Sequence, residues 1–369
     1  MNRLLDIGSF FQGIRFAFRA LQSRNFKLFF YGQIVSLLGT WMQNIALGWL
    51  VYRLTNSVFL LGVVGFAGQI PSLLITPFAG VYADRLNRHK VMIITQSVSM
   101  VLAFVLAFLV FSNTIQVWQI IMLALLNGVV LAVDTPFRHA FLLVMVGDKS
   151  LLQNAIALNS TLINSARFIG PTLGGIIIAL VGEGWCFLLN GVSFLAVIGA
   201  LMAMRVDRFH RKPTDSSILH DLKEGFRYAF NFVPIRYMLL LVGITGFFGL
   251  PFQVFMPVYA KDILGGGAVL LGILSGAMGA GALVGAFYLA SRKTIVRIPR
   301  LIMLTAAIFS VTLMGFAYSN VTSLSIILMF FIGFGMIVEF AATNTLLQTI
   351  VDEDKRGRVV SLYGLSLWE

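Results

Sequence analysis

Long apolar runs separated by short polar turns recur along the whole chain. About ten of them are long enough to cross roughly 30 Å of hydrocarbon as helices. They lie near residues 26–52, 58–82, 91–112, 116–135, 155–181, 185–204, 237–260, 268–290, 299–318 and 323–347, and a further run begins near Val359. Because each run far exceeds a barrel strand of about 10 residues, the pattern predicts an all-α polytopic membrane protein with about ten complete transmembrane helices and part of an eleventh.

Two polar segments divide the chain. Residues 1–24 are basic and Phe-rich without a cleavable-signal pattern, so we expect a cytoplasmic amphipathic N-terminus lying on the membrane surface. Residues 205–235 form a long polar linker, and the apolar spacing from Ile218 to Phe232 predicts an amphipathic helix within it. Six spans precede this linker. We therefore expect an N-terminal half over 25–204 and a C-terminal half over 236–369.

The two halves share a weak internal repeat at an offset of about 207 residues. The matching pairs are Val51-Tyr52 with Val258-Tyr259, Gly128 with Gly335, and Asp148-Lys149 with Asp354-Lys355. Repeats of this kind predict two parallel six-helix halves. By the same offset Glu369 corresponds to a position inside the fifth span, so we expect the C-terminal half to be incomplete in this chain.

Composition and charge narrow the class of protein. With 58% hydrophobic and 11% charged residues, the chain is not a soluble globular protein. The net charge of +12 does not indicate nucleic-acid binding, because 24 of the 27 basic residues fall on one side of alternating spans. Only Arg53 and Lys261 fall on the other side, and Arg167 falls within a span. The positive-inside rule then makes the N-terminus and the linker cytoplasmic.

Ionisable groups inside the spans are the candidates for chemistry. An isolated Arg167 would cost at least about 2.5–3.5 kcal/mol in the bilayer, so it either bonds statically to helix carbonyls or anchors an anionic or polar substrate group. Glu339 lies near the repeat equivalent of Asp134 and either takes up and releases a proton during transport or acts as a salt-bridged gate. Further candidate polar groups that line a cavity, or form interhelical hydrogen bonds, are Gln43, Asn44 and Asn344.

A polar turn runs from Gly80 to Lys90 between the second and third spans. It carries Asp84, Arg85 and Arg88, and charges of both signs belong at the membrane edge. We interpret Asp134 and Arg138 of the fourth span as forming a salt-bridge lock with this turn, which holds the cytoplasmic side closed. The alternative is that the turn serves only to fix the topology.

Two motifs resemble those of major facilitator superfamily transporters. The spacing from Gly80 to Arg88 resembles their loop between the second and third helices. Asn87 stands where glycine is usual, a mild departure because asparagine also tolerates a positive φ. The string Gly170-Pro171 with Gly174-Gly175 resembles the fifth-helix motif of exporters, although plain helix packing would also account for it. In that fold the fifth helix meets the glycine-rich eighth across the interface between the halves.

Further strings resemble the transmembrane-secretion-effector branch, with its enterobactin-exporter-like and macrolide-efflux-like carriers. They are Gly32-Gln33 through Gly39-Thr-Trp41-Met, Asp134-Thr-Pro136-Phe-Arg138, Asn154-Ala155 with Ala157-Leu158-Asn159, and Arg356-Gly357-Arg358-Val359 with Ser361-Leu362-Tyr363. The resemblance implies a major facilitator fold of two six-helix halves. It also implies proton-driven export of a small amphipathic molecule, siderophore or drug-like, across a bacterial cytoplasmic (inner) membrane by a monomer. No cofactor is then expected, because the proton gradient supplies the energy.

Other functions remain open on the sequence. A secondary importer on the same fold and a non-transporting, truncated remnant are the alternatives to export. An enzyme is not expected, because the spans contain no nucleophile–base pair or metal cluster. ATP-driven transport by this chain alone is not expected either, because the chain has no phosphate-binding Walker loop. A metal is not expected either, because Cys186 is the one cysteine and the four histidines fall in cytoplasmic segments.

Overall fold

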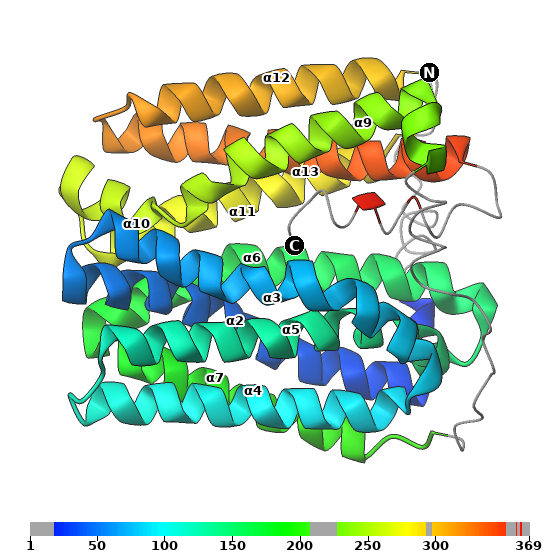
Figure 1. Cartoon of the computed structure of the whole chain (residues 1–369), viewed down its shortest axis with the longest axis horizontal. Helices are drawn as coiled ribbons and strands as arrows, with labels where there is room; N and C mark the ends of the chain where they lie inside the picture. The colour runs from blue at the N-terminus through cyan, green and yellow to red at the C-terminus, as the bar shows by residue number, and fades with distance from the viewer. Residues whose placement is uncertain (1–17, 207–226, 293–296, 352–358, 360–361, 364–369) are drawn as a thin grey trace, which may run out of the picture.

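The protein is a bundle of long helices that run nearly parallel to its long axis (Figure 1). The computed structural model describes residues 18–206, 227–292, 297–351, 359 and 362–363. Within these ranges every regular element is a helix, and 10 helices are long and apolar enough to cross a membrane. The predicted all-α polytopic fold is therefore confirmed.

Six long helices follow one another before the linker. They are α2 (Arg24–Thr55), α3 (Val58–Arg85), α4 (Arg88–Phe111), α5 (Val117–Val146), α6 (Leu152–Val181) and α7 (Glu183–Met202). The short helices η1 (Arg19–Gln22) and η2 (Lys149–Leu151) precede α2 and α6. Left-handed residues end several helices: Asn56 (φ 48°) caps α2, and Gly147 (φ 76°) caps α5. Asparagine and glycine tolerate this conformation best, which is why tight turns follow directly.

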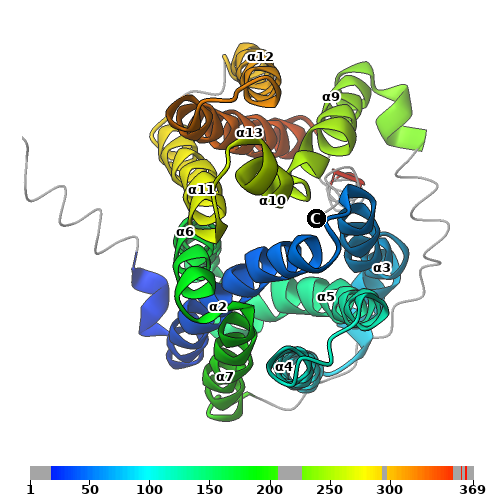
Figure 2. The same ribbon diagram turned by 90° about the vertical axis from the view of Figure 1, so that its left-hand side faces the viewer.

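A second group of helices follows the linker. Its long members are α9 (Val233–Ile244), α11 (Ala268–Ala290), α12 (Ile298–Ala317) and α13 (Thr322–Ile350). Figure 2 shows α2–α7 gathered on one side of the molecule and α9–α13 on the other. Residues 1–17 of the predicted N-terminal amphipathic segment, most of the predicted linker helix and the Asp354-Lys355 repeat lie outside the described residues.

The seventh span differs from its prediction as one continuous helix over 237–260. After α9 the chain continues through a π-helix η3 (Thr245–Gly249), a 3-10 helix η4 (Leu250–Gln253), α10 (Met256–Val258) and a second π-helix η5 (Tyr259–Ile263). Pro251 and Pro257 have no N–H to donate to the carbonyl four residues earlier, so two of the hydrogen bonds of a regular helix are missing within this short stretch. The span is therefore segmented where it approaches α2.

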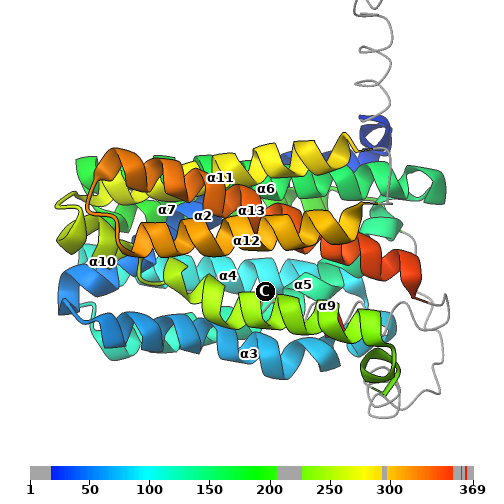
Figure 3. The ribbon, with the colours of Figure 1, turned by 90° about the horizontal axis from the view of Figure 1, so that it is seen from above.

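The bundle has two chemically different ends, which lie to the right and left in Figures 1 and 3. We call the right-hand end, where α3 ends at Arg85 and α4 begins at Arg88, the basic end. The opposite end carries the turn after Thr55, the start of α7 at Glu183 and the segment from Tyr259 to Gly267. The ends are named by their residues and not by a side of the membrane.

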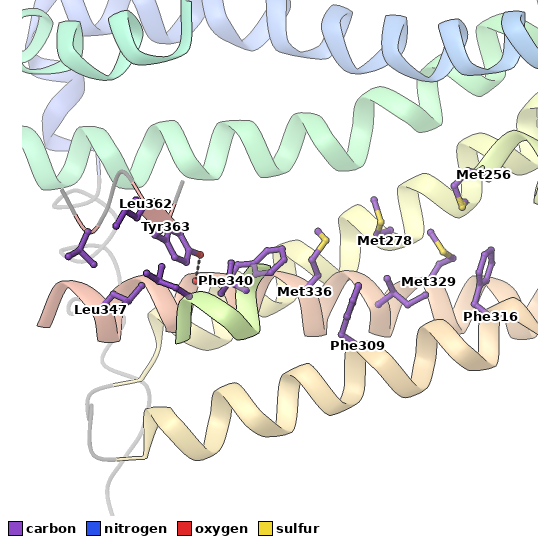
Figure 4. Packing of buried hydrophobic residues seen from close by; sticks show 14 of the residues in the cluster. Met256, Met278, Phe309, Phe316, Met329, Met336, Phe340, Leu347, Leu362 and Tyr363 are labelled. Atoms are coloured by element: carbon purple, nitrogen blue, oxygen red, sulfur yellow. Dashed lines mark hydrogen bonds between the residues drawn. The ribbon is translucent and has the colours of Figure 1, made fainter. Parts of the chain in front are cut away.

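The largest hydrophobic core lies in the second group of helices and is rich in methionine and phenylalanine. Figure 4 shows Met336 and Phe340 of α13 lining up with Phe309 of α12 and Met278 of α11. Ile45 and Trp49 of α2 pack against the same core, so the two groups share it. Large apolar side chains such as Phe59 (77% exposed) and Leu180 (77%) cover the outer surface. Such a surface suits lipid rather than water.

Candidate functional site

The two groups of helices meet along α6 and α11, where glycine faces glycine. A Cβ atom built on Gly175 would lie 2.6 Å from the Ala268 carbonyl oxygen, and one on Gly279 would lie 2.5 Å from Cα of Phe168. These distances leave no room for a side chain, so the helix backbones touch. The expected contact between the fifth and eighth spans is present (Figures 2 and 3).

The remaining glycines of the Gly170–Gly175 string pack against α2. A Cβ built on Gly170 would lie 2.5 Å from Cβ of Trp41, and one on Gly174 would lie 2.7 Å from Cγ2 of Ile45. Pro171 lies within α6, which continues past it to Val181. The string therefore lets α6 contact α2 and α11 at the same level, which is the packing role proposed for it as the alternative to an export role.

Arg167 lies one turn from this contact, where α2, α6 and α11 come together. Its guanidinium carbon is 4.9 Å from the centroid of the Trp41 ring, a cation–π arrangement. The Arg167 carbonyl oxygen lies 2.9 Å from a Cβ built on Gly279. The sequence pointed to Arg167 as a candidate and to Trp41 only as part of a family-like string, not as a partner of Arg167. Aromatic residues are too frequent in this chain for one of them to be singled out.

The three candidate amides have different surroundings. Asn190 of α7 donates a 2.8 Å hydrogen bond to Gln43, so this amide ties α2 to α7 within the first group. Asn44 is exposed on α2, four residues before Gly48, which faces Pro257 of the second group. Asn344 accepts a 3.0 Å hydrogen bond from Gln348 on α13. Asn44 and Asn344 therefore remain candidates for contact with a substrate, whereas Gln43 has a structural partner.

Glu339 is fully buried in α13. Its Oε1 atom accepts a 2.8 Å hydrogen bond from the Thr245 hydroxyl, at the start of the π-helix η3. Its Oε2 atom is buried with no hydrogen-bond partner among the described residues. Within the same part of the chain this carboxyl group makes no ion pair, which argues against the salt-bridged gate considered from the sequence. Thr245 is a partner that sequence spacing could not reveal.

Asp134 is also buried, at 1% exposure, but it is surrounded by donors. Thr95 and Gln96 of α4 donate hydrogen bonds of 2.6 and 2.8 Å to Oδ1. Arg138, one turn further along α5, donates from Nε to Oδ2 at 3.0 Å and forms an ion pair with it. This network joins α4 to α5 and gives the carboxylate charge a fixed partner.

The polar turn at the basic end differs from expectation at Asn87. Its φ is −70°, not positive, and its side chain accepts a 3.1 Å hydrogen bond from the Lys90 N–H as the N-cap of α4. The expectation of a positive φ was wrong here, because capping explains the residue. Arg88 donates to the carbonyl oxygens of Ala83 (2.7 Å) and Ala140 (3.2 Å), which fixes the turn to α5.

The lock proposed from the sequence is only partly described. Asp134 and Arg138 pair with each other, whereas the side chain of Asp84 lies outside the described part. A Cβ built on Gly80 would meet no atom within 4 Å, so packing does not require glycine there. The link between this turn and Asp134 stays a prediction.

The opposite end carries polar contacts that the sequence did not reveal. Arg53 of α2 forms an ion pair with Glu183 of α7, with 2.6 Å between Nε and Oε1. The neighbouring Tyr52 donates its hydroxyl to Asp262 of η5. Lys261 donates a 2.6 Å hydrogen bond to the Asn56 side chain. The last two contacts join the two groups of helices.

The described ranges contain no candidate metal site. No group of three or more His, Cys, Asp or Glu residues in these ranges could hold a metal ion. Cys186 is buried in α7, with its sulfur 3.8 Å from the Gly174 carbonyl oxygen.

Two groups of membrane-spanning helices, joined along the glycine-lined faces of α6 and α11 with Arg167 beside the contact, define the architecture of a membrane transporter. The chain belongs to the transmembrane secretion effector family, which it matches over residues 16–368. This family is a branch of the major facilitator superfamily, as the sequence motifs implied, and the protein is a multi-pass membrane transporter of that type.

Relatives and solved structures agree with this assignment. The chain is 28% identical to the staphyloferrin A transporter of Staphylococcus aureus, covering 91% of this chain and 84% of the relative. It is 23% identical to macrolide efflux protein A of Streptococcus pyogenes, covering 92% and 86%. Its fold is similar to that of a bacterial homologue of the human lysosomal transporter Spinster, with a TM-score of 0.68, 12% identity and coverage of 95% and 79%. These proteins are transporters and not enzymes, which confirms the expectation that this chain is not an enzyme.

Proposed function

We propose that this protein is a secondary active exporter that moves a small amphipathic molecule, siderophore or drug-like, out of a bacterial cell in exchange for protons. Export is supported by the relatives, whose names describe macrolide efflux and staphyloferrin A transport. The inner membrane would be its location. Alternating access between the two groups of helices would carry the molecule across, as the fold allows.

The observation that carries proton exchange is the environment of Glu339. A proton-coupling group must exist in both charged and neutral forms during the cycle. Glu339 has a neutral hydroxyl as its hydrogen-bond donor, and no cation pairs with it within the described residues. An ionised carboxylate without a cation is costly in an apolar site, so a change of protonation there changes the free energy of the conformation.

The substrate contacts would lie between the two groups of helices, around Arg167 and Trp41. A cation held against an indole ring offers both charge and a flat apolar surface, which suits an amphipathic molecule with an anionic or polar group. Asn44 and Asn344 would supply further hydrogen bonds. Replacing Arg167 with Ala should weaken binding, and Lys should restore it only partly because the planar guanidinium is lost.

The direction of transport depends on which end of the bundle faces the cytoplasm. The positive-inside rule supports a cytoplasmic location for the basic end, because most of the basic residues fall on that side of the alternating spans. Reporter proteins fused within 205–235 or at 291–298 should then be cytoplasmic, and fusions near Gly182 and Gly265 external. A cytoplasmic signal at Gly265 would contradict the proposed topology.

The decisive experiment measures uptake of labelled staphyloferrin A and of a labelled macrolide into everted membrane vesicles. An imposed gradient with an acidic interior should drive accumulation by the native protein. In the Glu339→Gln variant we expect gradient-driven accumulation to be lost, while exchange of labelled for unlabelled substrate continues. Asn344→Ala, on the same helix, serves as a variant that should weaken binding without removing the response to pH.

Two results would contradict the proposal. Normal gradient-driven accumulation by Glu339→Gln would exclude this residue as the coupling site. Accumulation only in right-side-out vesicles would identify an importer, the main alternative on this fold.

A further inference from the structure

Neighbouring residues at the end of α2 bind different partners. Tyr52 is 3% exposed, and its hydroxyl reaches across to Asp262 of η5. A buried tyrosine hydroxyl needs a hydrogen-bond partner, and here the partner belongs to the other group of helices. The contact therefore holds α2 of the first group against the seventh span of the second.

A second contact lies beside it and also joins the two groups. The Lys261 ammonium donates 2.6 Å to the side chain of Asn56, the left-handed residue that ends α2. The same ammonium lies 5.3 Å from the centroid of the Tyr52 ring. Two consecutive residues of η5 thus hold two sites on α2 that lie one turn apart.

Arg53 provides an internal contrast. It follows Tyr52 directly, yet its ion pair with Glu183 stays within the first group, between α2 and α7. The two basic residues that the charge pattern assigns to this end therefore have separate tasks. Arg53 joins two helices of the first group, and Lys261 joins the first group to the second.

The apolar contacts around these pairs also cross between the groups. Val254 of the seventh span fits against Gly65 of α3, where a built Cβ would lie 3.1 Å from the valine Cγ2 atom. Pro257 lies against Gly48 of α2 at 3.5 Å by the same measure. The polar pairs thus lie beside apolar contacts that also join the two groups, at the end of the bundle where Figure 2 shows α10 next to α2.

We propose that Tyr52–Asp262 and Lys261–Asn56 form a latch that holds the opposite end closed and must break each time that end opens. This inference rests on transport by alternating access as proposed above. The four residues position the two groups of helices and need not touch the substrate. Hydrogen bonds with one charged partner, as here, are strong enough for each pair to shift an open–closed equilibrium about tenfold.

The position of the latch connects it to the coupling site. The seventh span runs from Thr245, which donates to Glu339, to Lys261 and Asp262 of the latch. One segmented helix therefore touches both the buried acid and the closed end. A displacement of η3 that follows protonation of Glu339 has a continuous path to the latch through the chain itself.

The test measures the separation of the two groups at this end without using transport. Spin labels on cysteines at Thr114 and Asn320, in exposed turns of the first and second group, report the distance by pulsed electron resonance in lipid nanodiscs. The background carries Cys186→Ala, so that only introduced cysteines react. The variants are Tyr52→Phe, Asp262→Asn and Lys261→Gln, and Glu183→Gln is the matched control within one group.

We expect each latch variant to raise the long-distance population about tenfold relative to the closed one, and Glu183→Gln to leave it unchanged. Tyr52→Phe keeps the buried ring, so this variant remains informative if a charge variant fails to fold. Unchanged distances in all folded latch variants, or an equal shift in Glu183→Gln, would overturn the latch. If the native protein moves no substrate but the distances shift as expected, the latch stands and the transport proposal fails.

Discussion

Two buried carboxyl groups occupy related places in the two halves of this protein and have opposite surroundings. Asp134 of α5 and Glu339 of α13 lie about 205 residues apart, close to the offset of the internal repeat. Asp134 receives hydrogen bonds from Thr95, Gln96 and Arg138. Glu339 receives one, from Thr245, and its second oxygen has no partner in the described part of the chain.

The residue four positions further along each helix accounts for much of the difference. After Asp134 it is Arg138, whose guanidinium forms an ion pair with the acid. After Glu339 it is Thr343, whose hydroxyl donates 2.7 Å to the Glu339 backbone carbonyl instead of the side chain. The acid of the first half is paired with a cation, whereas the acid of the second half has no ion-pair partner in the part of the chain that the structure describes. A fixed charge stabilises a fold, and an uncompensated acid can respond to protons.

The largest expected effect comes from removing each acid in turn. Asp134→Leu would leave the donors of Thr95, Gln96 and Arg138 without an acceptor, and we expect a loss of about 3 kcal/mol in the free energy of unfolding. Glu339→Leu should leave stability unchanged or raise it, because a half-satisfied buried acid is replaced by an apolar side chain. Thermal unfolding in detergent measures both. Equal losses would remove the distinction between the two sites.

A smaller effect is expected from making the first site resemble the second. Arg138→Thr gives Asp134 the residue type that lies four positions after Glu339, where Thr343 stands. Asp134 then keeps its hydrogen bonds from Thr95 and Gln96 but loses its cation. Because the Arg138 side chain is partly exposed, we expect a loss of about 1–2 kcal/mol in unfolding free energy. Lys at the same position is the control and should recover part of it. A stability like that of the native protein would mean that the two hydroxyl and amide donors suffice.

The smallest effect is expected at Thr245. Thr245→Val keeps the shape of the side chain but removes the hydrogen bond to Glu339, which should cost about 1 kcal/mol of unfolding free energy. Thr245→Ser keeps the hydroxyl and should behave like the native protein. In the vesicle assay, Val should shift the pH dependence of uptake while Ser should not. Identical pH profiles for all three proteins would show that Thr245 has no part in setting the response of Glu339.

The sequence predicted the features that depend on local pattern. Apolar run length revealed the membrane-spanning helices, and the glycines near Gly175 and Gly272 pointed to the contact between α6 and α11. Partners across the fold were not predictable in this way. Neither Trp41 beside Arg167 nor Asp262 beside Tyr52 stands out, because aromatic residues and isolated charges near a turn are common along this chain.

Two local features were misread for physical reasons. Asn87 was expected to adopt a positive φ because asparagine tolerates one, but its amide oxygen caps α4 from extended backbone instead. The seventh span was taken as continuous although Pro251 and Pro257 lie within it, since its hydropathy gives no sign of a break. Hydropathy indicates whether a segment lies in the membrane, but it does not indicate whether the backbone hydrogen bonds of a helix continue through that segment.

The glycine-on-glycine contact of α6 and α11 has a consequence for the speed of conformational exchange. Helices that pack by side chains set ridges into grooves, and tilting them requires side chains to leave one groove and enter another. Where Gly175 faces Gly272, neither residue has a side chain to leave a groove. The two backbones can therefore tilt against each other without a change of rotamer at these positions. The contact therefore tolerates a change of angle between the helices but not a change of separation, because a single added methyl group at Gly175 would force the two backbones apart.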